Sequence, residues 1–306
     1  MDRRAWALLL ILGAIWGASY LFIKIGLRDL SPGMVSWLRV VLAAIVLVPL
    51  AVRRGGLANP REMLLILVLL AGVQVAGPFM LIALGEQEIS SSLAGILVSS
   101  APLFTALLAI WIDHEERSTG LRLAGVGLGL AGVVVLLGVD LSGSGAALLG
   151  GAQVVLASLG SAIGGVIAKH RLKDAEPLPI AATVMAASAV LLAPVGLATG
   201  PGSMPAAGPL AAVVALGLLG TGIAFAIFYS LIGWVGPART LVVTYIAPAF
   251  AVVYGVWFLD EEITVATLAG LALIVGGSWL AAGGVSVAEE PTPAGPAELP
   301  VGDHAS

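Results

Sequence analysis

Apolar stretches of about twenty residues recur ten times along this chain and constrain its fold more than any other feature. A helix needs about 20 such residues to cross roughly 30 Å of hydrocarbon, whereas the strands of a membrane barrel are about ten residues long with alternating polarity. Only 10 % of the 306 residues are charged and 59 % are hydrophobic. The sequence therefore predicts an all-α integral membrane protein with the lipid bilayer as a partner.

We predict one transmembrane helix for each apolar stretch. The ten predicted spans are residues 6–26, 33–52, 63–84, 89–112, 121–139, 146–168, 179–198, 207–232, 237–259 and 264–283. The first span follows Arg3 and Arg4, as in a signal peptide, but it exceeds the roughly 7–15 apolar residues of such a peptide. It also holds Trp16 and Tyr20 where cleavage needs small residues, so we interpret it as an uncleaved helix. Residues 285–306 are predicted to form a disordered cytoplasmic tail.

The two halves of the chain repeat each other. Residues 101–116 and 247–262 lie 146 positions apart, and six of their sixteen aligned residues are identical. A unit of five helices ends on the opposite side of the membrane from where it began, so the second copy must be inverted. We therefore predict ten transmembrane helices, arranged as two inverted five-helix repeats, residues 1–140 and 141–284, around a central cavity. This arrangement is typical of carriers that work by alternating access.

The positions of lysine and arginine predict the orientation. If the N-terminus is cytoplasmic, eleven of the fourteen Lys and Arg residues lie on the cytoplasmic side, as the positive-inside rule requires. The remaining three, Lys24, Arg28 and Arg39, lie near the outer ends of the first two spans. Eleven Arg against three Lys, with abundant Ala and Gly, is typical of a GC-rich bacterial genome. We expect both termini in the cytoplasm and the chain in a bacterial inner membrane.

Several motifs resemble a known family. Trp16-Gly17 lies in the first span, Arg39 precedes an Ala-rich apolar run, and a pattern from proline to glutamate occurs at 102–115 and again at 248–261. In this order the motifs resemble the drug/metabolite transporter superfamily, and within it the EamA-type proteins with two five-helix repeats. The resemblance implies an inner-membrane secondary transporter, often an exporter of amino acids or other small metabolites, with its cavity between inverted repeats. It implies no cofactor.

Two prolines occupy corresponding positions near the middle of the fourth and ninth spans. A proline inside a helix removes a backbone hydrogen bond, and the freed carbonyl must be satisfied by neighbouring helices or by water in a cavity. We interpret Pro102 and Pro248 as hinges beside the substrate path. A fixed kink with a packing role is the alternative.

Polar and aromatic side chains near the middle of the spans are candidates for lining the cavity. Hydrogen-bonding groups at this depth usually face the interior of a helix bundle. Serine and threonine can instead bond back to their own helix, and aromatic rings can simply pack. The amide of Gln74 is harder to satisfy locally. The candidates are Trp16, Ser19, Tyr20, Gln74, Ser99, Ser100, Ser158, Thr221, Tyr229, Thr244 and Tyr245.

Charged residues at the outer ends of the spans suggest a gate. A buried charge costs a few kcal/mol unless it pairs or reaches the interface. We hypothesise that Lys24 and Arg39 form ion pairs that close the outer side, although reaching the interface is the favoured alternative for Lys24. Val184 stands where the second repeat would carry a counterpart of Arg39, so the two mouths need not be gated identically. The candidate carboxylates are Glu86, Glu88, Glu261 and Glu262.

Other classes of function find little support in the sequence. A membrane-embedded enzyme would need clustered His, Asp or Glu, and the one candidate, His114 with Asp113 and Glu115, fits a solvated helix end. No metal-ligand cluster, basic patch for nucleic acid or ion-selectivity filter stands out. No Asp, Glu or His lies at the middle of a predicted span, so facilitated diffusion or exchange is favoured, although Glu86 could still couple to protons.

The sequence thus predicts a secondary transporter that exports small metabolites such as amino acids by alternating access. Import, or exchange of other small neutral solutes, is the alternative. No basic residue lies deeper in a span than Arg39, so a zwitterionic or neutral small molecule is preferred over one that bears a phosphate. The sequence does not define the oligomeric state.

Overall fold

The computed structural model describes residues 2–54, 56–57, 60–112, 120–140, 144–173 and 175–282. All regular elements in these ranges are helices, as predicted. Eight helical segments are long and apolar enough to cross a membrane, and two shorter apolar helices, Val243–Leu259 and Val265–Ala281, occupy the last two predicted spans. The predicted tail at 285–306 and the candidate cluster at 113–115 lie outside the described residues.

The helices follow the predicted order along the chain. In the first half they are α1 (Arg3–Gly26), α2 (Pro32–Arg53), α3 (Pro60–Leu70), η1 (Ala71–Ala76), α4 (Gly77–Glu88), α5 (Ser91–Val98), α6 (Ala101–Ile112), α7 (Gly120–Val135) and η2 (Leu136–Asp140). In the second half they are α8 (Gly145–Arg171), α9 (Pro177–Ala198), α10 (Ala207–Gly217), η3 (Leu218–Ile223), α11 (Ala224–Val235), α12 (Pro237–Thr240), α13 (Val243–Leu259) and α14 (Val265–Ala281).

A π-helical turn interrupts the third segment of each half. η1 joins α3 to α4, and η3 joins α10 to α11 at positions 147 residues further along the chain. Pro78 follows η1 and has no N–H to donate to the carbonyl four residues before it, which favours the wider turn. In η3, the Thr221 hydroxyl donates to the Leu216 carbonyl, five residues earlier, at 3.0 Å. The hydropathy pattern does not predict these turns. π-Helical turns are rare overall, and many of those that occur lie at functional sites.

The two candidate hinge prolines are not equivalent. In the first half the helix breaks at residues 99–100, and Pro102 is the second residue of α6, where a missing N–H costs nothing. In the second half Pro248 lies inside the continuous helix α13, and the break comes earlier, between α12 and α13. Pro102 therefore lies at the start of a helix and not inside one, which corrects its expected position, and the hinge roles of the two prolines stay predictions.

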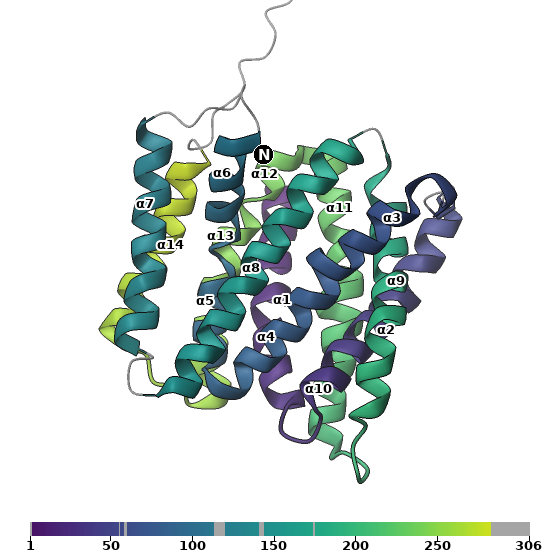
Figure 1. Ribbon diagram of the computed structural model, residues 1–306, viewed down its shortest axis with the longest axis horizontal. Helices are drawn as coiled ribbons and strands as arrows, with labels where there is room; N and C mark the ends of the chain where they lie inside the picture. Colours follow the sequence, from purple (N-terminus) through teal and green to yellow (C-terminus); the bar gives the residue numbers. More distant parts are fainter. Residues whose placement is uncertain are drawn as a thin grey trace, which may run out of the picture.

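Corresponding segments of the two halves pack against each other. α2 packs on α9, α5 packs on α13, and α7 packs on α14 at one edge of the molecule (Figure 1). Ser31, at the start of α2, donates to the carbonyl of Thr199, just beyond the end of α9, at 2.9 Å. The N–H of Ser91, at the start of α5, donates to Glu261, just beyond the end of α13, at 2.7 Å. Both pairs therefore run antiparallel.

Hydrogen bonds connect several loops at one end of the helix bundle. The Asp29 carboxylate accepts from the Ala206 N–H at 2.7 Å, and Lys24 donates to the Ile89 carbonyl at 2.8 Å. Together with the bond between Ser91 and Glu261, these contacts gather the loops into one face. We call it the Glu261 face, and it comprises residues 27–31, 89–90, 199–206 and 260–264.

Glycines allow α7 and α14 to approach with their backbones in contact. A Cβ atom added at Gly277 would lie 2.6 Å from the Gly125 carbonyl oxygen, and the backbone of Gly129 is also in the way. A Cβ at the neighbouring Gly276 meets nothing within 4 Å. Close packing through small residues drives helix association in membranes, so this pair depends on glycine at one position and not at the next.

Replacing Gly277 by alanine should therefore lower the thermal stability of the protein in detergent, because the two helices must separate. Overpacking of this kind costs about 1–3 kcal/mol. Gly276→Ala is the matched control and should unfold at the wild-type temperature or above it, since alanine is the better helix former. Equal unfolding temperatures for the two variants, measured by tryptophan fluorescence, would contradict the contact.

Candidate functional site

Arg39 joins the two halves from within the bundle. It lies on α2 with only 8 % of its surface exposed. Its Nε donates to the Thr221 hydroxyl of η3 at 2.9 Å, and its Cζ lies 3.6 Å from the centre of the Phe79 ring. A guanidinium over an aromatic face gains a cation–π attraction, which is larger where water is excluded. Arg39 thus ties the π-helical turn of the second half to two helices of the first.

The predicted ion pairs of the outer gate are not formed. Among the residues that the structure describes, neither Arg39 nor Lys24 forms an ion pair with a candidate carboxylate. The Lys24 Nζ instead donates to the carbonyls of Glu86 at 2.5 Å and Ile89 at 2.8 Å. The last carbonyls of a helix lack partners within the helix, so Lys24 satisfies the end of α4. The ion pair expected for Lys24 is therefore corrected, and its position at the membrane interface stays a prediction.

Glu261 joins two segments at this face through hydrogen bonds and not through the predicted ion pairs. Its carboxylate accepts from the backbone N–H groups of Ser91 at 2.7 Å and Ser92 at 3.0 Å, and from the Ser92 hydroxyl at 2.5 Å. A carboxylate is favourable at a helix N-terminus, because the first N–H groups lack helical partners and the helix dipole is positive there. Glu261 therefore fastens the end of the ninth segment to the start of the fourth.

The local backbone positions Glu261 for this contact. Asp260 has φ 55° and ψ 35°, the left-handed conformation that ends α13 and turns the chain back. The Glu261 N–H then donates to the Gly255 carbonyl at 3.2 Å. A side chain at Gly255 would collide with the Glu261 carboxylate and the Ser92 hydroxyl, so only glycine leaves room for it.

The other candidate carboxylates lie in different surroundings. Glu88 and Glu262 are exposed. Glu86 is fully buried, and neither of its carboxylate oxygens has a hydrogen-bond partner among the described residues. The sequence placed Glu86 near the membrane surface and gave no sign of this burial.

Most hydroxyl candidates for the cavity bond to the backbone of their own segment. Each donates to a backbone carbonyl three or four residues earlier, at 2.6–3.3 Å. The structure thus shows the alternative that the sequence left open for these side chains. They are Ser19, Ser99, Ser100 and Thr244.

Two candidates support the broken helix and its neighbours. The Ser158 hydroxyl on α8 donates to the Leu97 carbonyl at 3.1 Å, which helps to satisfy the end of α5 where it breaks. The Tyr245 hydroxyl donates to the Ser278 carbonyl of α14 at 3.3 Å, and the Ser278 hydroxyl donates to the Ser99 carbonyl at 3.4 Å. The bonds of Ser158 and Ser278 therefore connect the end of α5 to α8 and α14 of the second half, whereas the bond of Tyr245 joins α13 to α14.

Gln74 and Thr221 occupy corresponding positions in the two π-helical turns, 147 residues apart. Thr221 accepts from Arg39, as described above. The Gln74 side chain packs against Gly164 of α8, where an added Cβ would lie 2.8 Å from the Gln74 Cγ. The two turns therefore present polar side chains to the opposite half of the chain.

Aromatic candidates gather between α1 and α11. The Trp16 ring lies 5.2 Å from the ring of Phe228, and Tyr229 lies 5.5 Å from the same ring. Phe225 completes the cluster. Tyr20, one turn further along α1, lies against Gly95 of α5. The aromatic candidates thus pack where α1 contacts α11 and α5.

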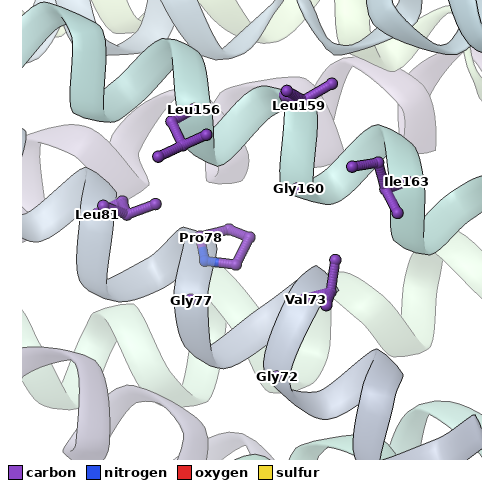
Figure 2. Close-up of a pocket in the computed structure, with 9 residues that line it drawn as sticks. All are labelled: Gly72, Val73, Gly77, Pro78, Leu81, Leu156, Leu159, Gly160 and Ile163. Carbon is purple, nitrogen blue, oxygen red and sulfur yellow. The ribbon is translucent and has the colours of Figure 1, made fainter.

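One pocket, of about 210 Å³, opens between η1, α4 and α8. Figure 2 shows Pro78 at its centre, facing Leu156 and Leu159 of α8. Its other lining residues are Gly72, Val73, Gly77, Leu81, Gly160 and Ile163. None of the predicted cavity residues lines it, and its apolar walls offer no side-chain hydrogen bonds to a polar solute.

The long apolar helices, the buried cross-links between halves and the small-residue contacts define a multi-pass membrane protein. The EamA-like transporter family model matches residues 4–138 and, a second time, residues 148–283. The chain therefore belongs to the EamA-like transporter family, which confirms the resemblance found in the sequence. Membership makes it a membrane transporter.

Relatives along most of the chain carry transporter names. The inner membrane transporter YedA of Escherichia coli is 29 % identical over 85 % of this chain and 85 % of its own. A probable terminal-alkyne amino-acid exporter of Streptantibioticus cattleyicolor is 28 % identical over 92 % of this chain and 93 % of its own. A crystal structure that is 23 % identical superposes with a TM-score of 0.66, covers 92 % of this chain and 97 % of that one, and shows the same fold.

Proposed function

We propose that the protein is a secondary transporter built from two inverted five-helix repeats, residues 1–140 and 141–284, around a central site. The antiparallel packing of α2 on α9 and of α5 on α13 carries this proposal. Each pair takes one helix from each stretch that matches the family model. Halves related in this way provide two interchangeable gates, which is the geometry of alternating access.

The substrates that we propose are small metabolites such as amino acids, moved outward across the inner membrane. Support comes from the relative named as an amino-acid exporter and from an Escherichia coli relative, 24 % identical over 92 % of this chain, named as a probable amino-acid metabolite efflux pump. The buried guanidinium of Arg39 and the polar side chains of the π-helical turns supply groups that suit a zwitterion.

Proteoliposomes test this function directly. Purified protein would be reconstituted into liposomes loaded with a ¹⁴C-labelled mixture of the protein amino acids, and efflux would be followed with and without unlabelled amino acids outside. We expect faster efflux than from liposomes that hold the label but no protein. Unlabelled amino acids outside should speed efflux further, because a carrier reorients toward the inside more readily with substrate bound. Efflux equal to that from protein-free liposomes with the same label would contradict amino-acid transport.

A further inference from the structure

Glu86 is the buried ionisable group that the contacts above leave unexplained. It lies in the last turn of α4 with no surface exposed. Neither Oε1 nor Oε2 has a hydrogen-bond partner in the described part of the chain, and the buried Ser91 hydroxyl nearby in the sequence also lacks one. Buried polar atoms are nearly always hydrogen-bonded in native proteins, so this corner of the Glu261 face needs a functional explanation.

Lys24 and Arg39, the cations whose charge acts on Glu86, are both engaged elsewhere. From α1 come Tyr20 and Lys24, and the Lys24 ammonium donates to the carbonyls of Glu86 and Ile89 rather than to the carboxylate. From α2 comes Arg39, which is held by Thr221 and Phe79.

Glu261, beyond α13, also interacts with Glu86 electrostatically, but its own carboxylate is occupied by the start of α5. Of the other elements packed on α4, the described part of α8 carries Lys169, His170 and Arg171 only at its far end, and η1 carries no titratable residue. α5 offers only serine hydroxyls, and Glu88 on α4 itself is exposed.

An ionised carboxylate without donors in a dry site costs far more than a neutral one, and such a group normally takes up a proton. Separation of α5 from α13 would break the bonds of Glu261 and admit water to the same corner. The carboxylate then gains hydrogen bonds from water and can release its proton. We propose that Glu86 is a proton-binding site that is loaded when the Glu261 face is closed and unloaded when that face opens.

This inference rests on the proposed transport function and adds a driving force to it. The carboxylate takes one proton from solution and returns one proton to solution in each cycle. When Glu86 takes up its proton from one side of the membrane and releases it to the other, movement of the substrate is coupled to movement of the proton. The absence of a carboxylate at the middle of a predicted span favours facilitated diffusion, with proton coupling through Glu86 as the alternative, and the burial of Glu86 supports that alternative.

The test compares Glu86→Gln with Glu88→Gln, the exposed carboxylate two residues along the same helix. Each variant and the wild type would be reconstituted and assayed with the labelled amino-acid mixture in two ways. The first assay is accumulation driven by a pH gradient, imposed in either direction. The second is exchange of labelled for unlabelled amino acids at equal pH, which needs no net proton movement and also shows that the variant is folded.

We expect the wild type and Glu88→Gln to accumulate amino acids in response to a pH gradient. Glu86→Gln should lose about tenfold or more of this accumulation while its exchange stays within about threefold of wild type. Gradient-driven accumulation by Glu86→Gln at the wild-type level would overturn the proposal, as would a wild type that exchanges amino acids but ignores the gradient. Loss of both activities in Glu86→Gln would also overturn it, since Glu86 would then serve binding or folding. Absence of exchange in the wild type would instead contradict the proposed function.

Discussion

Arg39→Gln should exchange amino acids at about one tenth of the wild-type rate or less. The guanidinium connects Thr221 of η3 to Phe79 of α4, and a glutamine side chain is too short and uncharged to make both contacts. A buried hydrogen bond to a charged group is worth about 1.5–3 kcal/mol, and a loss of about 1.4 kcal/mol in the transition state is tenfold in rate. The measurement is exchange in proteoliposomes at equal amounts of folded protein.

Two variants at Thr221 serve as controls for this prediction. Thr221→Val leaves the Arg39 donor without its acceptor and should slow exchange in the same direction. Thr221→Ser keeps the hydroxyl and should stay close to wild type. Wild-type exchange by Arg39→Gln would show that the link between α2 and η3 takes no part in transport.

Glu261→Ala should open the Glu261 face. Its carboxylate accepts three hydrogen bonds at the start of α5, and their removal should favour the open state by about 3 kcal/mol, or roughly a hundredfold in population. The chain contains no cysteine, so one can be introduced as a reporter. Ser99→Cys suits this purpose because Ser99 is buried and bonds only within its own turn through its hydroxyl.

The rate at which a membrane-impermeant maleimide labels this cysteine measures the opening. We expect at least about tenfold faster labelling, from the Glu261 face, in the Glu261→Ala background. Glu262→Ala is the matched control, because Glu262 is the next residue and is exposed, and it should leave labelling unchanged. Equal labelling in both backgrounds would show that the contact between Glu261 and α5 does not hold the face closed.

The features that the sequence predicted are those carried by local composition and by repetition. Apolar stretches of the length needed to cross a membrane predicted the helices, and the repeat at 101–116 and 247–262 indicated that the fourth and ninth segments correspond. Polarity and depth singled out Thr221 and Glu261, and both make contacts between the halves.

The partners of these residues could not be predicted in the same way. The atoms that satisfy Lys24 are backbone carbonyls, and the sequence pattern does not show which carbonyls a helix end leaves free. The burial of Glu86 depends on neighbours from several helices. A π-helical turn adds a residue without interrupting the apolar run, so hydropathy does not reveal it, although Gly77-Pro78 after η1 was a usable signal.

The inverted relation of the two halves is tested most directly by two single cysteines at corresponding positions. Arg28 follows the first segment and Lys173, 145 positions later, follows the sixth, and both are exposed. Intact cells that express Arg28→Cys or Lys173→Cys would be treated with the impermeant maleimide, then opened and treated again. We expect labelling of position 28 from outside and of position 173 only after the cells are opened. Labelling of both positions from the same side would mean that the halves share one orientation, and would contradict the two-gate architecture.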